Sequence, residues 1–362
     1  MLIIHMADIH LDSRLGERYK REQGERRNRE ILTRFSAAVD YAGREGAEAV
    51  LISGDLFDSE KTKKETRDTV SAVIRNHPGI RFFYLRGNHD RTGVLSGYEL
   101  PNLFTFGKEY KAYRLRNVTI GGVELSRENA SVLSGLHYSD PDGIHILMLH
   151  GSAGEYRKKD DATEIPLREL KNRNIDYLAL GHIHSYRAFS LDSRGTAVYP
   201  GCLEPRGFDE PGEKGFVRIE IDEENGRVSH CFVPFSERTL RVLPVEVTDC
   251  GTTEDCFVRI TAALSGHPVS EEDMLLVRLS GTKPVTVEFD TEYLAERLRD
   301  LFYLVSVEDY TELLLLPEDY EYDRSLKGEF VRLVLSDGDL SEEEKKQIAG
   351  LGLRALDGGK IA

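Results

Sequence analysis

The sequence predicts an α/β fold for most of the chain, followed by a small α+β domain and C-terminal helices. Up to about residue 235, short apolar runs alternate with amphipathic stretches, a pattern typical of strands and helices around a buried sheet. The chain has 362 residues, which exceeds the usual span of one compact domain. After residue 235 the charge balance and the pattern both change. These observations predict a large first domain and a smaller second one.

Five apolar runs are the predicted core strands of the first domain. They are MLIIHM at 1–6, EAVLIS at 48–53, RFFYLR at 81–86, HILMLH at 145–150 and DYLAL at 176–180. Residues 29–46 predict a helix that stops at Gly46, and residues 63–79 predict a second helix, ended by Pro78 and Gly79. The apolar stripe of the first helix consists of Ile31, Phe35, Ala38, Val39 and Ala42.

Four shorter apolar stretches follow the fifth run. They are YRAFSL at 186–191, TAVYPG at 196–201, GFVRIEI at 215–221 and RVSHCFVPF at 227–235. Because Gly-rich turns separate them, we expect consecutive antiparallel strands.

The second part of the chain is acidic. From residue 236 onward, 14 Lys and Arg face 27 Asp and Glu, against 34 and 36 before it, so most of the net charge of −15 is C-terminal. LRVLPVEVT at 240–248 opens a segment that we expect to be rich in strands, with TEDCFVRITAAL, DMLLVRLSG and PVTVEF after it and a helix around TEYLAERLRDLF. We therefore predict domains at 1–238 and 239–318, then a helical segment at 319–362 with amphipathic helices at 322–335 and 341–356.

The composition of the chain predicts its cellular compartment and the state of its cysteines. No apolar run is long enough to cross a membrane, and the first one is too short for a signal peptide, so a cytoplasmic protein is expected. The four cysteines, Cys202, Cys231, Cys250 and Cys256, form no C-x-x-C pair. We expect buried free thiols rather than a disulfide framework or a zinc finger.

A net charge of −15 disfavours an anionic partner such as nucleic acid, but one basic segment weakens this objection. Residues 13–34 hold eight basic and four acidic residues. Basic side chains here are candidates for phosphate contacts, and a solvated loop and helix face is the alternative interpretation. The candidates are Arg14, Lys20, Arg21, Arg26 and Arg27.

Polar residues follow each of the five apolar runs. The runs end at ADIH, SGDLFD, RGNHD, HGS and GHIH, and ligands in open α/β sheets bind beyond the carboxyl ends of strands. If the chain stays extended there, His182 and His184 face the same side, as do Asp8 and His10. The residues expected to converge are Asp8, His10, Asp55, Asn88, His89, His150, His182 and His184.

These residue types predict a metal centre. Carboxylate, amide and imidazole groups without thiolates suit a divalent ion such as manganese, iron or zinc. Seven candidate ligands besides His89 exceed what one tetrahedral ion needs, whereas two ions that share a carboxylate would use them all. Paired ions can hold a phosphate and activate water, so phosphoester hydrolysis is the predicted reaction class.

The order D-x-H, G-D, G-N-H-[DE], H and G-H-x-H, at Asp8, Asp55, Asn88, His150 and His182, resembles the calcineurin-like metallophosphoesterase superfamily. The resemblance covers about residues 1–235. It implies a four-layer α/β/β/α sandwich with a di-metal centre, often manganese. One ion would take Asp8, His10, Asp55 and His184. The other would take Asp55, Asn88, His150 and His182, with a hydroxide between them as nucleophile.

The resemblance also places a general acid at His89, beside the leaving oxygen, with Asp90 hydrogen-bonded to its imidazole. A role as a further metal ligand or a structural role is the alternative for His89. His5, His77, His137, His145, His230 and His267 lack a matching motif and are expected in the core or on the surface.

IIHMADIHLDS, GDLFDS and YPGCLEPRGFDEPGEKGF look like the SbcD/YhaO group of DNA repair nuclease subunits. This similarity implies a DNA exonuclease whose domain at 239–318 caps the DNA groove. It also implies partners, namely DNA, a coiled-coil ATPase of the SbcC/YhaN kind docked on the C-terminal helices, and a second copy of the chain in a homodimer. Several such nucleases carry a histidine three residues after the bridging aspartate, where this chain has Asp58, so endonuclease activity is less well supported.

Two other functions stay open at this point. A small diester such as a cyclic nucleotide is the alternative substrate, and it would require a closed pocket rather than an open rim. A non-catalytic scaffold for the ATPase is the alternative of another class.

Overall fold

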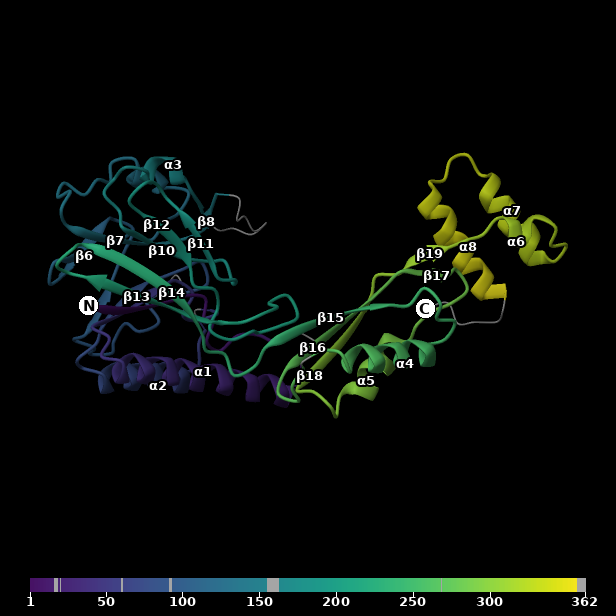
Figure 1. Cartoon of the computed structure of the whole chain (residues 1–362), viewed down its shortest axis with the longest axis horizontal. Coiled ribbons are helices and arrows are strands. Elements are labelled where there is room, and N and C mark those ends of the chain that lie inside the picture. Colours follow the sequence, from purple (N-terminus) through teal and green to yellow (C-terminus); the bar gives the residue numbers. More distant parts are fainter. Residues whose placement is uncertain are drawn as a thin grey trace. The chain divides into compact units, whose positions relative to one another are not determined.

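The computed structural model describes residues 1–15, 19, 21–59, 61–90, 93–154, 163–267 and 269–356. It divides into two compact units, Met1–Thr239 and Leu240–Ala362, and Figure 1 labels many of their elements. Within the described ranges, none of the helices combines the length and the apolarity needed to span a bilayer.

The first unit contains two six-stranded sheets. The first sheet has the order β14-β13-β1-β2-β3-β4, in which β1 to β4 are parallel and β13 is antiparallel to both of its neighbours. Its strands are β1 (Leu2–Met6), β2 (Ala49–Ser53), β3 (Arg81–Leu85), β4 (Leu103–Thr105), β13 (Gly215–Asp222) and β14 (Arg227–Pro234).

The second sheet has the order β11-β12-β10-β7-β6-β5, with parallel strands in the middle and antiparallel strands at both edges. Its strands are β5 (Lys111–Leu115), β6 (Val118–Gly122), β7 (Ile144–His150), β10 (Tyr177–Gly181), β11 (Arg187–Ser190) and β12 (Thr196–Tyr199). A separate short pair is formed by β8 (Ser152–Ala153) and β9 (Glu164–Ile165).

The two sheets pack face to face between outer helices. Side chains such as Leu51 and Phe83 from the first sheet form one buried cluster with Ile146 and Met148 from the second. The other face of the first sheet packs against α1 (Arg21–Arg44) and α2 (Lys64–Asn76), and that of the second against η1 (Ala130–Leu133) and α3 (Leu167–Leu170). The predicted α/β/β/α sandwich is therefore confirmed.

Periodicity identified the buried face of α1 correctly. The five residues of the predicted stripe are all buried, and Gly46 ends the turn after the helix with a positive φ of 72°. The helix begins at Arg21, however, so much of the basic segment is helical.

The four strands after β10 pair as predicted but belong to different sheets. β11 and β12 form an antiparallel pair on the second sheet, whereas β13 and β14 form another on the first. The segment 200–214 thus passes from one sheet to the other, which a local strand pattern does not encode.

Cysteine burial was predicted correctly at three positions and wrongly at one. Cys202, Cys250 and Cys256 are buried free thiols, whereas Cys231 is exposed. Cys231 lies on β14, an edge strand whose alternate residues face solvent.

The second unit has a parallel sheet of the order β15-β16-β18 and a short β17-β19 pair. Its strands are β15 (Leu240–Glu246), β16 (Met274–Ser280), β17 (Thr282–Pro284), β18 (Leu304–Asp309) and β19 (Glu312–Leu314). Its helices are α4 (Thr253–Leu264), α5 (Thr291–Leu298), α6 (Glu318–Glu321), α7 (Leu326–Ser336) and α8 (Glu342–Leu356). The predicted pair of C-terminal helices corresponds to α7 and α8.

Two expectations for this unit were wrong. Residues 253–264 form a helix, because Thr252 and Asp255 make a capping box in which each side chain accepts a hydrogen bond from the other's backbone. PVTVEF is mostly outside the strands, since β17 ends at Pro284, which has no N–H to extend a ladder. Val285 and Phe289 are buried in hydrophobic clusters instead.

Candidate metal centre

The ends of five strands from both sheets meet at one place. β1, β2 and β3 of the first sheet end beside β7 and β10 of the second, and two glycines allow this approach. A Cβ atom at Gly181 would overlap the backbone oxygen of Ser53, and one at Gly54 would overlap Nδ1 of His150. Only glycine fits these two positions without movement of the neighbouring strand end.

The ligand-bearing segments are not extended, which corrects the expectation from the i, i+2 spacing. Asp8, His10, Asp55 and His182 have positive φ values of 52°, 48°, 50° and 105°. Such left-handed backbone costs on the order of 1–3 kcal/mol for a residue other than glycine, and it persists where the surrounding structure holds it. The side chains therefore come together because of these turns and not because of the alternation of residues along an extended strand.

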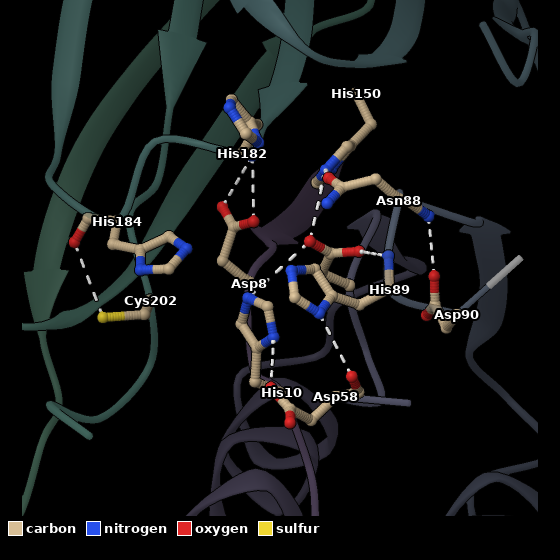
Figure 2. A network of polar contacts seen from close by, with 12 residues as sticks. Asp8, His10, Asp58, Asn88, His89, Asp90, His150, His182, His184 and Cys202 are labelled. Atoms are coloured by element: carbon tan, nitrogen blue, oxygen red, sulfur yellow. Dashed lines mark hydrogen bonds and ion pairs between the residues drawn. The ribbon is translucent and has the colours of Figure 1, made fainter. Parts of the chain in front are cut away.

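The structure brings all seven predicted ligands into one cluster, in which Figure 2 labels each of them except Asp55. Ligand atoms of Asp8, His10 and His184 lie within 4.8 Å of one another, as do those of Asp8, Asp55 and His150. Nε2 of His150 lies 3.0 Å from Oδ1 of Asn88 and 3.3 Å from Oδ2 of Asp55. The ring of His182 packs edge-on against that of His150, with 5.5 Å between the centroids.

Two buried carboxylates at the centre suit a cation. Asp8 is fully buried and Asp55 nearly so. Burial raises the pKa of Asp8, and the negative charge of Asp55 raises it further. Burial also disfavours ionisation of Asp55, but the nearby histidines and the backbone N–H of His89 outweigh burial and lower the pKa of Asp55. Adjacent buried carboxylates are costly unless positive charge lies beside them, so the pair fits divalent ions.

The imidazoles support the same conclusion. Burial, with the charge of Arg206 next, lowers the pKa of His10 to about 3, and a neutral imidazole is the form that binds a metal. Nε2 of His10 is buried without a hydrogen-bond partner, 3.6 Å from Oδ2 of Asp55. Burial disfavours the charged form of His150, but Asp55 raises its pKa to about 9, so this imidazole would release a proton on binding a metal.

His89 lies at the centre, but the expected contact with Asp90 is wrong. Asp90 is fully buried and accepts hydrogen bonds from Tyr84 Oη at 2.5 Å, from the backbone N–H of Gly87 at 2.7 Å and from that of Leu56 at 2.9 Å. Nδ1 of the exposed His89 instead lies 3.1 Å from the backbone oxygen of Asp58. Asp90 therefore shapes the loop after β3 and does not hold the imidazole.

The basic segment divides into exposed and buried residues. Arg27 is fully buried, where it forms ion pairs with Glu204 and Glu30, so it is excluded as a DNA contact. Arg21 and Arg26 are exposed and pair with acidic residues one turn along α1. Arg14 is exposed, and its backbone N–H lies 3.3 Å from Oδ2 of Asp58. Lys20 lies outside the described residues.

Sequence reasoning missed two residues beside the ligands. Arg206 forms ion pairs with Asp58 and Glu210, and Glu210 in turn contacts Nδ1 of His184. Both lie in the stretch EPRGFDEPGEKG, where charged residues among glycines and prolines were the available signal.

A cavity of about 500 Å³ borders the ligands Asn88 and His150. Its lining includes the side chains of Arg86, Lys108 and Arg127. Arg86 forms a bidentate pair with Glu124 at 2.7 Å, which fixes one wall of the cavity.

The chain is similar to a known protein family and to several curated proteins. Residues 1–186 match the model of the calcineurin-like phosphoesterase family. YhaO of Bacillus subtilis, an uncharacterized metallophosphoesterase, is 27% identical over 78% of this chain and 72% of its own length. The DNA double-strand break repair protein Mre11 of Aeropyrum pernix is 30% identical over 78% of this chain and 74% of its own. The match to Mre11 of Sulfurisphaera tokodaii, at 27% identity, spans 60% of this chain and 59% of the relative.

The match to the family model and the 30% identity over most of both chains agree with the geometry of the centre. The chain therefore belongs to the calcineurin-like phosphoesterase family, enzymes that use divalent metal ions to hydrolyse phosphoesters.

Proposed function

We propose that this protein is a DNA exonuclease that works with two divalent ions, and that the ions are manganese. The observation that carries the proposal is the convergence of seven oxygen and nitrogen donors from five strand ends, with two buried carboxylates among them. Such donors without thiolates suit manganese, iron or zinc, and manganese is the ion that the family resemblance favours.

The proposed ligand assignment is the one that the family resemblance implies. Asp8, His10, Asp55 and His184 would hold one ion, and Asp55, Asn88, His150 and His182 would hold the other. The bound ions would supply Lewis acidity, which polarises phosphoryl oxygens and makes water a stronger acid.

His89 is the proposed general acid for the leaving oxygen. The backbone oxygen of Asp58 accepts the Nδ1–H of its imidazole, so the proton for the leaving oxygen would come from the Nε2–H of the doubly protonated ring. Its exposure allows contact with substrate, whereas the buried Asp90 only sets the conformation of the loop that carries it.

DNA is the proposed substrate because of the relatives and one exposed cation. The Mre11 relatives are named as DNA double-strand break repair proteins. Arg14 lies in an exposed position directly beside Asp58, where its guanidinium can contact a phosphate of an extended substrate. Arg21 and Arg26 are weaker candidates, because each already pairs with a glutamate.

The test is nucleotide release from linear duplex DNA by the purified chain in Mn²⁺. We expect release that stops on addition of EDTA, and Arg14→Ala should weaken DNA binding with a shallower salt dependence while hydrolysis of a small diester is retained. Hydrolysis of the small diester without any release from DNA would contradict the proposal.

A small diester is the second candidate substrate, and the cavity beside Asn88 and His150 favours it. A volume of about 500 Å³ suits one nucleotide, since pockets for small molecules span about 300–1,000 Å³. Inhibition by mononucleotides but not by oligonucleotides would favour this substrate over DNA.

We further propose roles for the second unit. The α+β part is a cap for the DNA groove, and the C-terminal helices are the docking site of a coiled-coil ATPase of the SbcC/YhaN kind. The support for docking is a set of exposed apolar side chains on α7 and α8, which are Leu326, Leu333, Ile348, Leu351 and Leu356.

A further inference from the structure

Two proposed ligands of the same ion each contact a carboxylate through Nδ1. Nδ1 of His10 lies 3.1 Å from Oδ1 of Asp58, and Nδ1 of His184 lies 2.6 Å from Oε1 of Glu210. A carboxylate accepts the Nδ1–H of a histidine and so leaves Nε2 unprotonated. Both imidazoles are therefore held in the tautomer that binds a metal through Nε2, and their centroids are 5.1 Å apart.

Arg206 joins the two carboxylates. Its Nη1 lies 3.2 Å from Oδ1 of Asp58, and its Nη2 and Nε lie 2.9 Å and 3.2 Å from Oε1 of Glu210. Nη2 also lies 3.1 Å from Nδ1 of His184, but it donates to Glu210, since a protonated Nδ1 accepts no hydrogen bond. The side chain of Arg206 is only 17% exposed, that of Asp58 16% and that of Glu210 2%. Little water therefore screens these contacts.

The segment that carries Arg206 is itself anchored on both sides. Before it, Arg27 pairs with Glu204 and donates to the backbone oxygen of Pro205 at 2.8 Å. After it, Nζ of Lys214 donates to the backbone oxygen of His184 at 2.8 Å. The position of the guanidinium is thus determined by packing rather than by a mobile surface loop.

The other proposed ion position has a different support. Nδ1 of His150 donates to a backbone oxygen, that of Ser53, at 2.9 Å. The charged network of Asp58, Arg206 and Glu210 contacts His10 and His184, which belong to the first position.

We propose that Arg206 is a positioning residue that, through Asp58 and Glu210, fixes the imidazoles of His10 and His184 and so sets the affinity of one of the two metal positions. We name these three residues the carboxylate clamp. Asp58, which stands where a histidine is found in several similar nucleases, thereby acquires a role of its own in this chain. The inference rests on the proposed metal centre.

The experiment is a titration of the full metal-free chain with Mn²⁺. Calorimetry and electron paramagnetic resonance measure the binding at each step. For Arg206→Met we expect two binding steps, one about 10- to 100-fold weaker than in the wild type and one unchanged, because partners of metal-bound histidines contribute to affinity on that scale. Arg206→Lys should restore only part of the loss, since a point charge cannot bridge two carboxylates as a guanidinium does.

Arg194→Met is the matched control. Arg194 makes a bidentate pair with Asp176 at 2.8 Å and 3.0 Å, at the end of β10 opposite the metal centre. We expect both binding steps of this variant to match the wild type.

Equal affinities of Arg206→Met and the wild type would overturn the proposal, as would an equal loss at both steps. Circular dichroism of the metal-free variant checks its fold. If Arg206→Met does not fold, the same titration of Asp58→Asn takes its place. We expect weaker Mn²⁺ binding at one of the two steps only. Unchanged Mn²⁺ binding at both steps would overturn the proposed role of the carboxylate clamp. A wild-type chain that binds no Mn²⁺ would refute the metal centre itself, before any variant is compared.

Discussion

His89 is exposed, whereas the proposed metal ligands around it are buried or half-buried. This difference separates a group that meets the substrate from groups that hold the ions. We predict that His89→Ala lowers kcat by about 10²- to 10⁴-fold on DNA, because an alkoxide leaves poorly without a proton. The loss should be much smaller on bis(p-nitrophenyl) phosphate, whose leaving group needs no acid. Equal losses on both substrates, or a lower content of bound Mn²⁺, would contradict the role of His89 as an acid.

His182 and His184 are one residue apart but have different surroundings. His182 lies on the His150 side of the cluster, and His184 lies with Asp8 and His10. We predict that His182→Ala and His184→Ala each reduce the number of Mn²⁺ ions bound per chain, as measured by elemental analysis after equilibrium dialysis. His137→Ala, at an exposed histidine outside the cluster, is the control. Full stoichiometry in both site variants would rule out the assignment of these ligands.

At the scale of elements, α1 is attached to the rest of the first unit by a network of ion pairs. Glu30 accepts hydrogen bonds from Arg238 Nε at 3.0 Å and Nη2 at 2.9 Å, and from Arg27 Nη1 at 3.0 Å. Burial opposes ionisation of Glu30, but these two arginines outweigh it and lower its pKa from 4.5 to about 2. The helix therefore carries structural charges as well as exposed cations.

We predict that Glu30→Gln lowers the free energy of unfolding at pH 7 by on the order of 1–2 kcal/mol, after allowance for partial exposure of the carboxylate. Because the folded pKa lies below the unfolded one, the stabilisation is complete above about pH 4.5 and disappears as the pH falls toward about 2. Urea unfolding at several pH values measures this. A difference between variant and wild type that stays constant from pH 7 to pH 3 would contradict the contribution of Glu30.

At the scale of the whole molecule, the C-terminal helices have one covered and one uncovered apolar face. Val331 and Val334 of α7 are buried in one cluster with Ala349 and Leu353 of α8, whereas Leu326 and Leu333 are 70% and 71% exposed. Exposed apolar side chains gathered on one hairpin are typical of a protein-binding surface.

If a coiled-coil ATPase docks there as proposed, we predict that Leu333→Asp abolishes its co-elution with the chain in size-exclusion chromatography. Stability should change by less than about 0.5 kcal/mol, since the side chain is largely exposed. Val258→Asp, at a residue 60% exposed on α4, is the control and should leave co-elution intact. Undiminished complex formation by Leu333→Asp would place the docking surface elsewhere.

Much of the metal centre could be predicted because each ligand lies at the end of an apolar run or within a few residues after it. Parallel strands end at the same edge of a sheet, so Asp8, Asp55 and Asn88 had to come close together once the runs were identified as strands. The buried stripe of α1 was predictable for a similar reason, since helical periodicity is a local property.

The charged partners of these residues could not be predicted, because they are distant in the sequence. Arg206 and Asp58 are 148 residues apart, and Arg27 and Glu204 are 177 apart. Helical spacing places Arg27, four residues before Ile31, on the buried stripe of α1, but nothing near it in the chain indicates Glu204 as its partner. The contact of Asp90 with Tyr84 rather than His89 depends on the turn after β3. Local order in the chain thus determined the metal ligands, whereas packing between distant segments determined which charges support them.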